Sequence, residues 1–395
     1  MSSAPTRRRA EAPLPARRPK FRRPPDSGRL RVALDVLPLV GQPSGVGAAC
    51  RGLLEALLEH SEVEVSTYAV TRRSFVARRE VPRSVRFRGR PVPTSLAQAA
   101  WQVSSLVSAE RLAGPADVVH GINFAVPPGR SAGTVVTVHD MTAARFPELC
   151  TPATLRYPAL VRRAVEKGAL VHVPSGWVRD EVVELLGVSP DRVHVVHWGV
   201  PPVPEPTTPP PVEPPFVLAL GTVEPRKDYP TLVAAFDAMS RESSELRLVV
   251  AGADGWGTGS LTEAVAARGL EDRVVRLGYV NEEERSALLW NASVLAYPSL
   301  YEGFGFPPLE AMAAGVPVVA TRAGGVPEVV GDAALLVEPR DAPALAAALA
   351  EAAGDGQVRR RLVEAGRERV RGYSWARTAE EMIAVYRASR HREPD

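Results

Sequence analysis

The chain of 395 residues contains only two cysteines, Cys50 and Cys150, and aromatic residues make up 6% of it. Two cysteines are too few for a disulfide framework or a thiolate cage around a metal. No stretch approaches about 18 consecutive apolar residues, so the sequence predicts no transmembrane helix. The arginines near the N-terminus are not followed by an apolar segment, so we expect no secretory signal and a reduced, cytoplasmic protein.

Several motifs that define other enzyme classes are also absent. The chain has no Asp-x-Asp pair to hold a divalent metal beside a diphosphate, no P-loop, no Gly-x-Ser-x-Gly and no His-Glu-x-x-His. The sequence therefore predicts no metal site. A dehydrogenase is disfavoured, because Cys50 stands where the third glycine of the dinucleotide fingerprint would follow Gly45 and Gly47.

Basic residues are concentrated at the N-terminus. Residues 1–29 hold eight arginines and one lysine against two acids. Because the whole chain has a net charge of only +3, the rest of it, the body of the protein, is mildly acidic. This Pro- and Arg-rich tail is expected to be disordered. It is either a solvated extension or a contact for anionic lipid or nucleic acid. The acidic body argues against nucleic acid as a partner of the folded part.

The rest of the chain alternates short apolar segments with helical patterns of about 10–15 residues, which predicts parallel sheets built from βαβ units. Nine prolines within residues 201–215 mark a stiff linker between two such series. The fold class is therefore α/β, with two Rossmann-like domains, 30–200 and 216–373, facing across a cleft. A C-terminal helix and tail, 374–395, would pack on the second domain or cross back to the first. Ligands of such sheets bind at the carboxyl ends of the strands, so the cleft is the expected site.

The most informative segment lies between a strand and a helix in the second series. The loop Glu302-Gly303-Phe304-Gly305 precedes a helix that opens with Phe306-Pro307-Pro308, a start whose N–H groups and dipole attract phosphate. Glu302 in the loop and Glu310, eight residues later in the first helical turn, suit hydrogen bonds from sugar hydroxyls. Helix capping is the alternative role for Glu310.

Further candidates follow the ends of other predicted strands. Arg226 and Lys227 lie at the mouth of the same cleft and suit a diphosphate leaving group, with a solvated surface pair as the alternative. Gly45 and Gly47 form either a ligand loop or a simple tight turn. His139 either contacts substrate or is a satisfied structural histidine.

Together these motifs resemble those of the retaining GT-B glycosyltransferases of family 4, the glycosyl transferases group 1, from about Leu30 to about Tyr386. The family's E-x7-E motif stands as Glu302 and Glu310, and its GTLEPRKN motif as residues 221–228. The resemblance implies that Glu310 holds the ribose hydroxyls of a nucleotide and Glu302 the hydroxyls of the donor sugar. It implies that Arg226 and Lys227 bind the diphosphate and stabilise it as it leaves.

The resemblance also implies supporting contacts: backbone N–H groups of Gly303, Phe304 and Gly305 for sugar or phosphate, Gly45 and Gly47 near the diphosphate and acceptor, His139 near the transferred sugar, and Tyr279-Val280 for the base. The chain departs from the family at Thr222, where many members carry Arg, and at Trp198-Gly199 in place of Asn-Gly.

The function implied is retaining, metal-independent transfer of a hexosyl group from a nucleotide-diphosphate sugar to a hydroxyl of a glycan or lipid-linked acceptor, with no permanently bound cofactor. GDP-mannose is the favoured donor because GTLEPRKN-type members are often mannosyltransferases; UDP- and dTDP-sugars remain open. Capsule, exopolysaccharide or glycolipid assembly would all fit. The alternatives are another GT-B enzyme, such as a sugar-nucleotide epimerase or a phosphorylase, and a non-catalytic GT-B scaffold.

A second basic segment bears on the acceptor. Residues 72–90 hold eight arginines and one acid, with Phe75 and Phe87 among them. An anionic membrane surface attracts such a segment by about 1 kcal/mol per basic residue. Either this segment or the N-terminal tail would then place the protein peripherally on the inner face of the membrane. A solvated loop is the alternative for 72–90.

Overall fold

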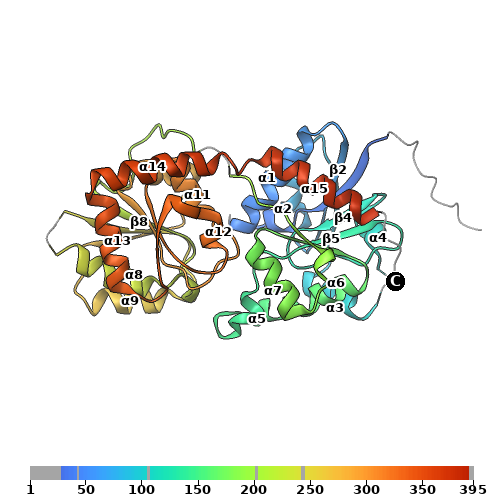
Figure 1. Cartoon of the computed structure of the whole chain (residues 1–395). Helices are drawn as coiled ribbons and strands as arrows, with labels where there is room; N and C mark the ends of the chain where they lie inside the picture. The colour runs from blue at the N-terminus through green and yellow to red at the C-terminus, as the bar shows by residue number, and fades with distance from the viewer. Residues whose placement is uncertain (1–27, 42–43, 105–106, 201–202, 242–244, 391–395) are drawn as a thin grey trace, which may run out of the picture.

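The structure is a computed structural model that describes residues 28–41, 44–104, 107–200, 203–241 and 245–390. It consists of two parallel β-sheets, each with helices packed against it, as Figure 1 shows. The expected α/β class is confirmed. The predicted N-terminal tail lies outside the described residues apart from its last two, as do 201–202 of the predicted linker and residues 391–395.

The first sheet has seven parallel strands in the order β3-β2-β1-β4-β5-β6-β7. Its strands are β1 Leu30–Asp35, β2 Val63–Val70, β3 Arg86–Arg90, β4 Val118–Gly121, β5 Gly133–Thr137, β6 Leu170–Val173 and β7 Val193–Val195. The chain order reverses between β1 and β4, which makes their carboxyl ends the switch point of this sheet. Six of these strands match predicted apolar segments.

The remaining strand of this sheet, β3, contradicts the alternative that residues 72–90 form a solvated loop. This segment forms helix α2, Ser74–Arg79, and then edge strand β3. The sequence RFRGR carries arginine at alternate positions, so no apolar run marks it as a strand. Arginines on an edge strand fit its position, because charged side chains discourage pairing with another chain.

Helices connect the strands of the first sheet, and α1 follows β1, one of the two strands at its switch point. The helices are α1 Gly45–Glu59, α3 Thr94–Val103, α4 Ala109–Ala113, α5 Thr142–Arg145, α6 Tyr157–Glu166 and α7 Gly176–Leu186. Ser44 caps α1, because its side chain accepts a hydrogen bond from the N–H of Gly47 at 3.1 Å. Gly45 and Gly47 therefore lie in the first turn of α1, and the expectation that they form a loop is wrong.

The second sheet has six parallel strands in the order β10-β9-β8-β11-β12-β13. Its strands are β8 Phe216–Leu220, β9 Arg247–Ala251, β10 Val274–Gly278, β11 Val294–Tyr297, β12 Val318–Thr321 and β13 Ala334–Val337. Its helices are α8 Tyr229–Met239, α9 Thr258–Ala266, α10 Glu282–Asn291, α11 Phe306–Ala313, α12 Val326–Val330 and α13 Ala342–Gly354. The switch point lies between β8 and β11, both buried along their whole length.

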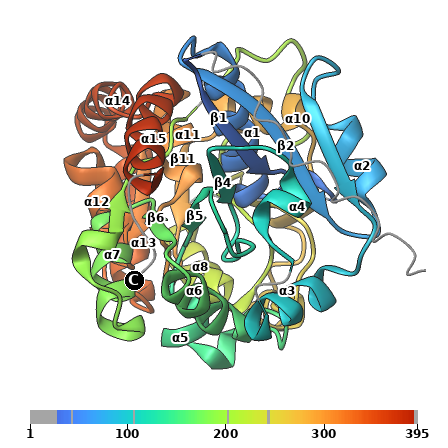
Figure 2. The same cartoon turned by 90° about the vertical axis from the view of Figure 1, so that its right-hand side faces the viewer.

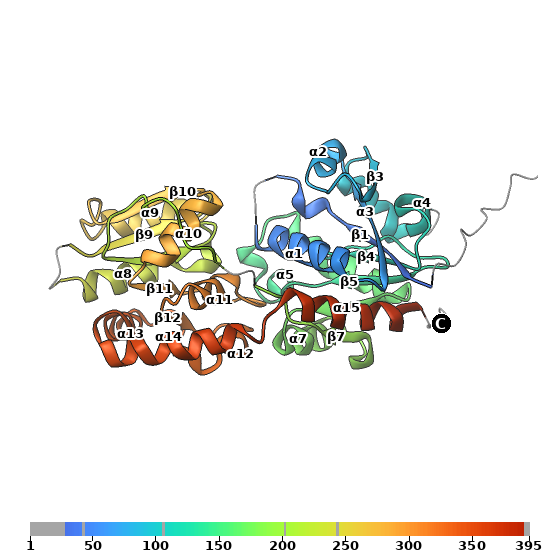
Figure 3. The ribbon, with the colours of Figure 1, turned by 90° about the horizontal axis from the view of Figure 1, so that it is seen from above.

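The C-terminal helix crosses back to the first sheet, which decides between the two expected positions. Helix α14, Gly356–Val370, packs beside α11 and α13, and α15, Trp375–Arg390, lies against α1 and β5 (Figures 1, 2 and 3). The indole of Trp375 fills the space beside Gly52, where an added Cβ would lie 2.2 Å from it. The Tyr386 hydroxyl lies 2.8 Å from His120 Nδ1 inside the first unit. None of the described helices is long and apolar enough to cross a membrane.

Candidate functional site

A cluster of opposite charges lies at the switch point of the second sheet. Arg226 and Lys227 follow β8, and Glu302 follows β11. One carboxylate oxygen of Glu302 lies 2.5 Å from an Arg226 nitrogen, and the other lies 2.6 Å from Lys227 Nζ. A second carboxylate, Glu224, lies 2.5 Å from the other terminal nitrogen of Arg226. The structure thus brings Glu302 into direct contact with Lys227, 75 residues earlier in the chain, and with the adjacent Arg226.

Burial makes this cluster electrostatically strong. Burial opposes ionisation of Glu302, but the charges of Arg226 and Lys227 outweigh it and lower the pKa of Glu302 to about 2. Burial lowers the pKa of Lys227, although Glu302 acts in the opposite direction. Lys227 Nζ also lies 3.3 Å from the Tyr297 hydroxyl and 4.8 Å from the centre of that ring. Glu302 therefore pairs with both cations and holds them in fixed positions.

The backbone after β8 orients the two cations. Residues Pro225–Lys227 form a short 3-10 turn that ends at Asp228, whose φ of 46° is left-handed. Asparagine and aspartate tolerate this conformation better than most residues. The carbonyl of Arg226 accepts a hydrogen bond from the N–H of Leu300 at 2.7 Å, which ties this turn to the loop after β11.

The loop after β11 is clamped between the two sheets. An added Cβ at Gly303 would lie 1.8 Å from the carbonyl oxygen of His139, so no larger residue fits there. The Ser175 hydroxyl, at the start of α7, donates to the carbonyl of Gly303 at 2.7 Å. Phe304 is buried, and Gly305 has a φ of 113°, which favours glycine. Gly303, Phe304 and Gly305 therefore form a rigid strip between the two units.

The start of α11 offers fewer hydrogen-bond donors than its position suggests. Pro307 and Pro308 carry no N–H, so only Phe306 and the preceding loop can donate at this end of the helix. Glu310 is the fifth residue of α11, and the expectation that it lies in the first turn is wrong. Its side chain forms an ion pair with Arg285 of α10, a partner that the sequence analysis missed. The sequence places a basic residue on the preceding helix, but no pattern in it pairs that residue with Glu310.

The remaining predicted residues occupy different parts of the structure. His139 Nε2 donates to the carbonyl of Ile122 at 2.7 Å, and burial lowers its pKa, so it is a neutral imidazole with one satisfied nitrogen. Gly45 lies against the second unit, since an added Cβ would be 3.7 Å from the Phe306 ring. Tyr279 is exposed and Val280 half-buried after β10, at the edge of the second sheet and two strands from β8.

A carboxylate from the second unit caps a helix of the first. Glu328 of α12 accepts hydrogen bonds from the N–H groups of Gly176 at 2.9 Å and Trp177 at 3.1 Å, at the N-terminus of α7. The same carboxylate lies 3.0 Å from His197 Nε2. The positive end of the helix macrodipole favours such an anion. Burial opposes ionisation of Glu328, but these hydrogen bonds outweigh it and lower its pKa.

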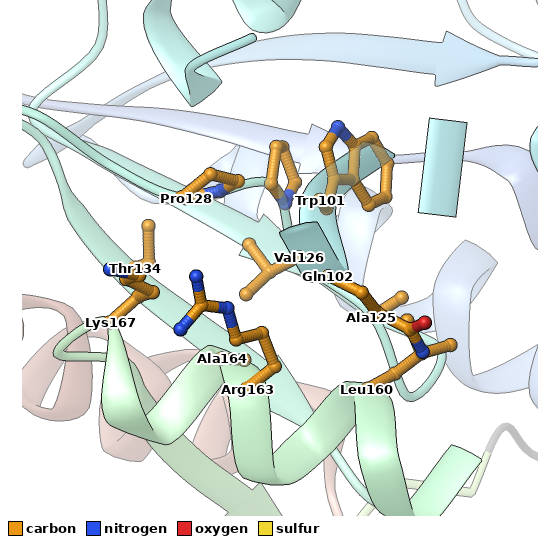
Figure 4. A pocket seen from close by; sticks show the side chains of 11 residues that line it. Trp101, Gln102, Ala125, Val126, Pro128, Thr134, Leu160, Arg163, Ala164 and Lys167 are labelled. Atoms are coloured by element: carbon orange, nitrogen blue, oxygen red, sulfur yellow. The ribbon is translucent and has the colours of Figure 1, made fainter. Parts of the chain in front are cut away.

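Two of the cavities that described residues line lie in the first unit. The larger, of about 480 Å³, opens at the switch point between β1 and β4. The smaller, of about 10 Å³, lies between α3, α6 and residues 125–128 (Figure 4). That volume holds roughly one water molecule, so of these two cavities it is the larger that can take a small organic ligand.

Two parallel α/β sheets with a charged cluster between them define a class, the GT-B glycosyltransferases. Sucrose-phosphate synthase from Thermosynechococcus elongatus superposes with a TM-score of 0.71 and 21% identity, covering 91% of this chain and 99% of that chain. HepE from Anabaena, in complex with UDP-glucose, superposes with a TM-score of 0.70 and 17% identity, covering 91% and 100%. At these identities the likeness shows the GT-B fold.

Sequence comparison identifies the family. The model for Glycosyltransferase Family 4 matches residues 43–203, and that for Glycosyl transferases group 1 matches residues 205–369. The O-antigen chain mannosyltransferase B of Escherichia coli is 30% identical over 282 residues, 68% of this chain and 74% of that relative. The MMP alpha-(1->4)-mannosyltransferase of Mycolicibacterium hassiacum is 34% identical over 272 residues, 64% of each chain. The chain belongs to the family 4 glycosyltransferases and is a glycosyltransferase.

Proposed function

We propose that the chain transfers a hexosyl group, with mannosyl favoured, from a nucleotide-diphosphate sugar to a hydroxyl of a glycan or lipid-linked acceptor. In this proposal residues 216–373 bind the donor, residues 30–200 bind the acceptor, and 201–215 link the two. The observation that carries the proposal is the buried cluster of Arg226, Lys227 and Glu302 at the switch point of the second sheet, facing the first unit.

The two cations are suited to the leaving group. A diphosphate gains negative charge as its bond to the anomeric carbon breaks, and fixed positive groups in a buried site stabilise that charge strongly. Arg226 would exchange part of its pairing with Glu224 and Glu302 for phosphate oxygens, and Lys227 would do the same. Glu302, held between them, would accept hydrogen bonds from the donor sugar with its remaining lone pairs. Glu310 would leave Arg285 to hold the ribose hydroxyls.

The transfer step is proposed to retain the anomeric configuration. The acceptor oxygen bonds to the anomeric carbon on the face from which the diphosphate leaves, and the acceptor proton passes to a departing phosphate oxygen. The backbone N–H groups of Gly303, Phe304 and Gly305, together with Gly45 and Gly47 at the start of α1 and His139, would surround the reacting groups. Tyr279 and Val280 would receive the base.

Metal independence and donor identity belong to the same proposal. The described residues contain no group of three or more His, Cys, Asp or Glu side chains arranged to hold a metal. The two relatives named as mannosyltransferases support a mannosyl donor, for which GDP-mannose is our first choice. The structural neighbour with bound UDP-glucose keeps a UDP-sugar open, and dTDP-sugars are a third choice.

An NMR time course tests the reaction. Purified protein would be incubated with GDP-mannose, UDP-glucose or a dTDP-sugar and a panel of glycoside acceptors, with Mg²⁺ or with EDTA. The proposal expects one donor to give a new glycoside with the anomeric configuration of the donor, at equal rates in EDTA. An inverted product, or a rate abolished by EDTA, would contradict it. A changed sugar nucleotide formed without acceptor would indicate an epimerase. A complete lack of turnover with every donor would indicate a non-catalytic scaffold.

We also propose that the 72–90 segment contacts an anionic membrane surface. Phe75 on α2 is 63% exposed, and Arg72, Arg79 and Arg83 of the same segment are exposed as well. Co-sedimentation with phosphatidylglycerol vesicles tests this. Replacing Arg72, Arg79 and Arg83 by Gln should release the protein, and unchanged sedimentation would contradict the contact.

A further inference from the structure

Tyr301 precedes Glu302 in the loop after β11, and its buried side chain contacts the first unit. Its ring packs against Phe146, with the two ring centres 5.4 Å apart. Its hydroxyl accepts a hydrogen bond from the N–H of Met141 at 2.9 Å and donates one to the carboxylate of Glu181. The side chain of a second-unit residue is thus bonded to two elements of the first unit, the start of α5 and helix α7.

Glu181 is an acidic residue in a buried position, 3% exposed. One of its carboxylate oxygens accepts a hydrogen bond from Arg145 Nε at 3.2 Å, and the other accepts the one from Tyr301. Burial raises the pKa of Tyr301 well above its ordinary value, and Asp140 and Glu181 act in the same direction, so the hydroxyl stays protonated and remains a donor. Because an unpaired buried carboxylate oxygen is costly, this contact resists separation of the loop from α7.

Helix α7 holds this loop at two points. Helices α5 and α7 lie on the side of the first unit that faces the second (Figures 1 and 3). Besides the contact between Glu181 and Tyr301, the Ser175 hydroxyl at the start of α7 donates to the carbonyl of Gly303 at 2.7 Å. The hydrogen bonds at positions 301 and 303 therefore lie on either side of Glu302 and fix its backbone against the first unit.

The main chain of Tyr301 contacts the charged cluster. Its carbonyl accepts a hydrogen bond from an Arg226 nitrogen at 2.7 Å. The next residue, Glu302, pairs with both Arg226 and Lys227. Tyr301 thus joins the first unit, through its side chain, to the groups proposed to bind the diphosphate and the donor sugar, through its backbone.

We infer that Tyr301 is a positioning residue for the transfer. Its hydroxyl, held by Glu181, fixes the loop that carries Glu302 against α7, so that a donor bound by the second unit lies at the correct place relative to the first. This inference rests on the proposed function and adds two residues that act through Glu302 rather than by touching substrate. A displacement of about 1 Å between reacting groups is enough to lower a rate by about a hundredfold.

Tyr301→Phe tests the inference, because it removes the hydroxyl and keeps the ring. Calorimetry with GDP, UDP and dTDP measures nucleotide Kd, and the NMR time course with the donor and acceptor panel measures kcat. We expect kcat at saturating donor to fall by about tenfold or more, while the nucleotide Kd changes by less than about twofold. An unchanged kcat would overturn the inference. A Kd that rises as much as kcat falls would also overturn it, because the hydroxyl would then serve donor binding within the second unit.

Tyr386→Phe is the control for loss of a buried tyrosine hydroxyl. The Tyr386 hydroxyl lies 2.8 Å from His120 Nδ1, between α15 and β4 of the first unit. Each variant loses one buried hydrogen bond, so both should unfold at a lower temperature than wild type. Tyr386→Phe should nevertheless keep the kcat of wild type. An equal loss of kcat in the two variants would indicate general destabilisation and overturn the inference.

Glu181→Met tests whether the hydroxyl acts through the carboxylate, since methionine has a similar length and accepts no strong hydrogen bond. Arg145 keeps a second partner, Glu184, in this variant. We expect Glu181→Met to lower kcat about as much as Tyr301→Phe, and the double variant to lose no more than either single change. Losses that multiply, to about a hundredfold in the double variant, would show two independent effects and overturn the inference.

Turnover by the wild-type protein separates this inference from the proposed function. If wild type transfers a sugar and Tyr301→Phe is equally active, the proposed function stands and the positioning role is refuted. If wild type turns over none of the donors, the proposed function is refuted and the positioning role with it. Nucleotide binding by Tyr301→Phe also shows that this variant is folded.

Discussion

Replacing Glu302 by Gln removes the one carboxylate that pairs with both cations of the cluster. The lowering of its pKa from 4.5 to about 2 measures how strongly the folded chain favours the ionised carboxylate. At about 1.4 kcal/mol for each pH unit, this corresponds to about 3 kcal/mol of stability at neutral pH. For a unit of this size, such a loss lowers the melting temperature by about 6–12 °C.

The pH dependence of this loss has a definite sign. Because folding lowers the pKa of Glu302, its contribution is complete above the unfolded value of about 4.5 and disappears as the pH falls towards 2. Urea denaturation of wild type and Glu302→Gln between pH 7 and pH 3 measures the difference. It should be constant above about pH 5 and shrink below it.

The matched control for Glu302→Gln is Glu338→Gln. Glu338 also pairs with an arginine, Arg322 at 3.5 Å, but its side chain is 71% exposed. Exposed pairs contribute about 0–1 kcal/mol, so this variant should be nearly as stable as wild type. Equal stability of the Glu302 and Glu338 variants at pH 7, or a Glu302 difference that persists unchanged at pH 3, would refute the electrostatic account of the cluster.

Three further predictions concern the proposed reaction. Lys227→Ala should lower kcat by about a hundredfold or more at saturating donor while the protein stays folded, and unchanged turnover would exclude its role at the leaving group. Glu310→Gln should weaken nucleotide binding by about tenfold in calorimetry, and an unaltered Kd would count against ribose binding. Gly303→Ala should force the two units apart, because its Cβ would overlap the His139 carbonyl, and so raise the radius of gyration in X-ray scattering. Gly259→Ala, where an added Cβ meets nothing within 4 Å, is its control, and equal radii would contradict the close packing.

Most strands could be predicted from the sequence because they are short, apolar and buried. Residues 216–220, for example, are buried on both faces, so the whole segment is apolar. Strand β3 could not be predicted, since arginine occupies alternate positions along it and its pairing with β2 is a tertiary contact. The crossing of α15 was left open for a similar reason: the fit of Trp375 beside Gly52 joins segments far apart in the chain.

The sequence predicted which residues form the candidate site better than it predicted the contacts between them. Motif spacing located Arg226, Lys227 and Glu302, but not their direct ion pairs, because the distance between the ends of β8 and β11 depends on strand order. The pairing of Glu310 with Arg285 depends on how α10 packs against α11, and no local pattern encodes that packing. The contribution of Glu328 from the second unit to the N-terminus of α7 was likewise not visible in the sequence.

The most direct test of the central claim, that the cluster after β8 and β11 holds a nucleotide diphosphate without metal, is calorimetric titration in EDTA. GDP, UDP and dTDP would each be titrated into wild-type protein and into Arg226→Ala. We expect one of the three to bind wild type in EDTA, with a Kd that rises by at least about tenfold in the variant. Nucleotide binding of equal strength in both proteins, or binding that requires added Mg²⁺, would contradict it.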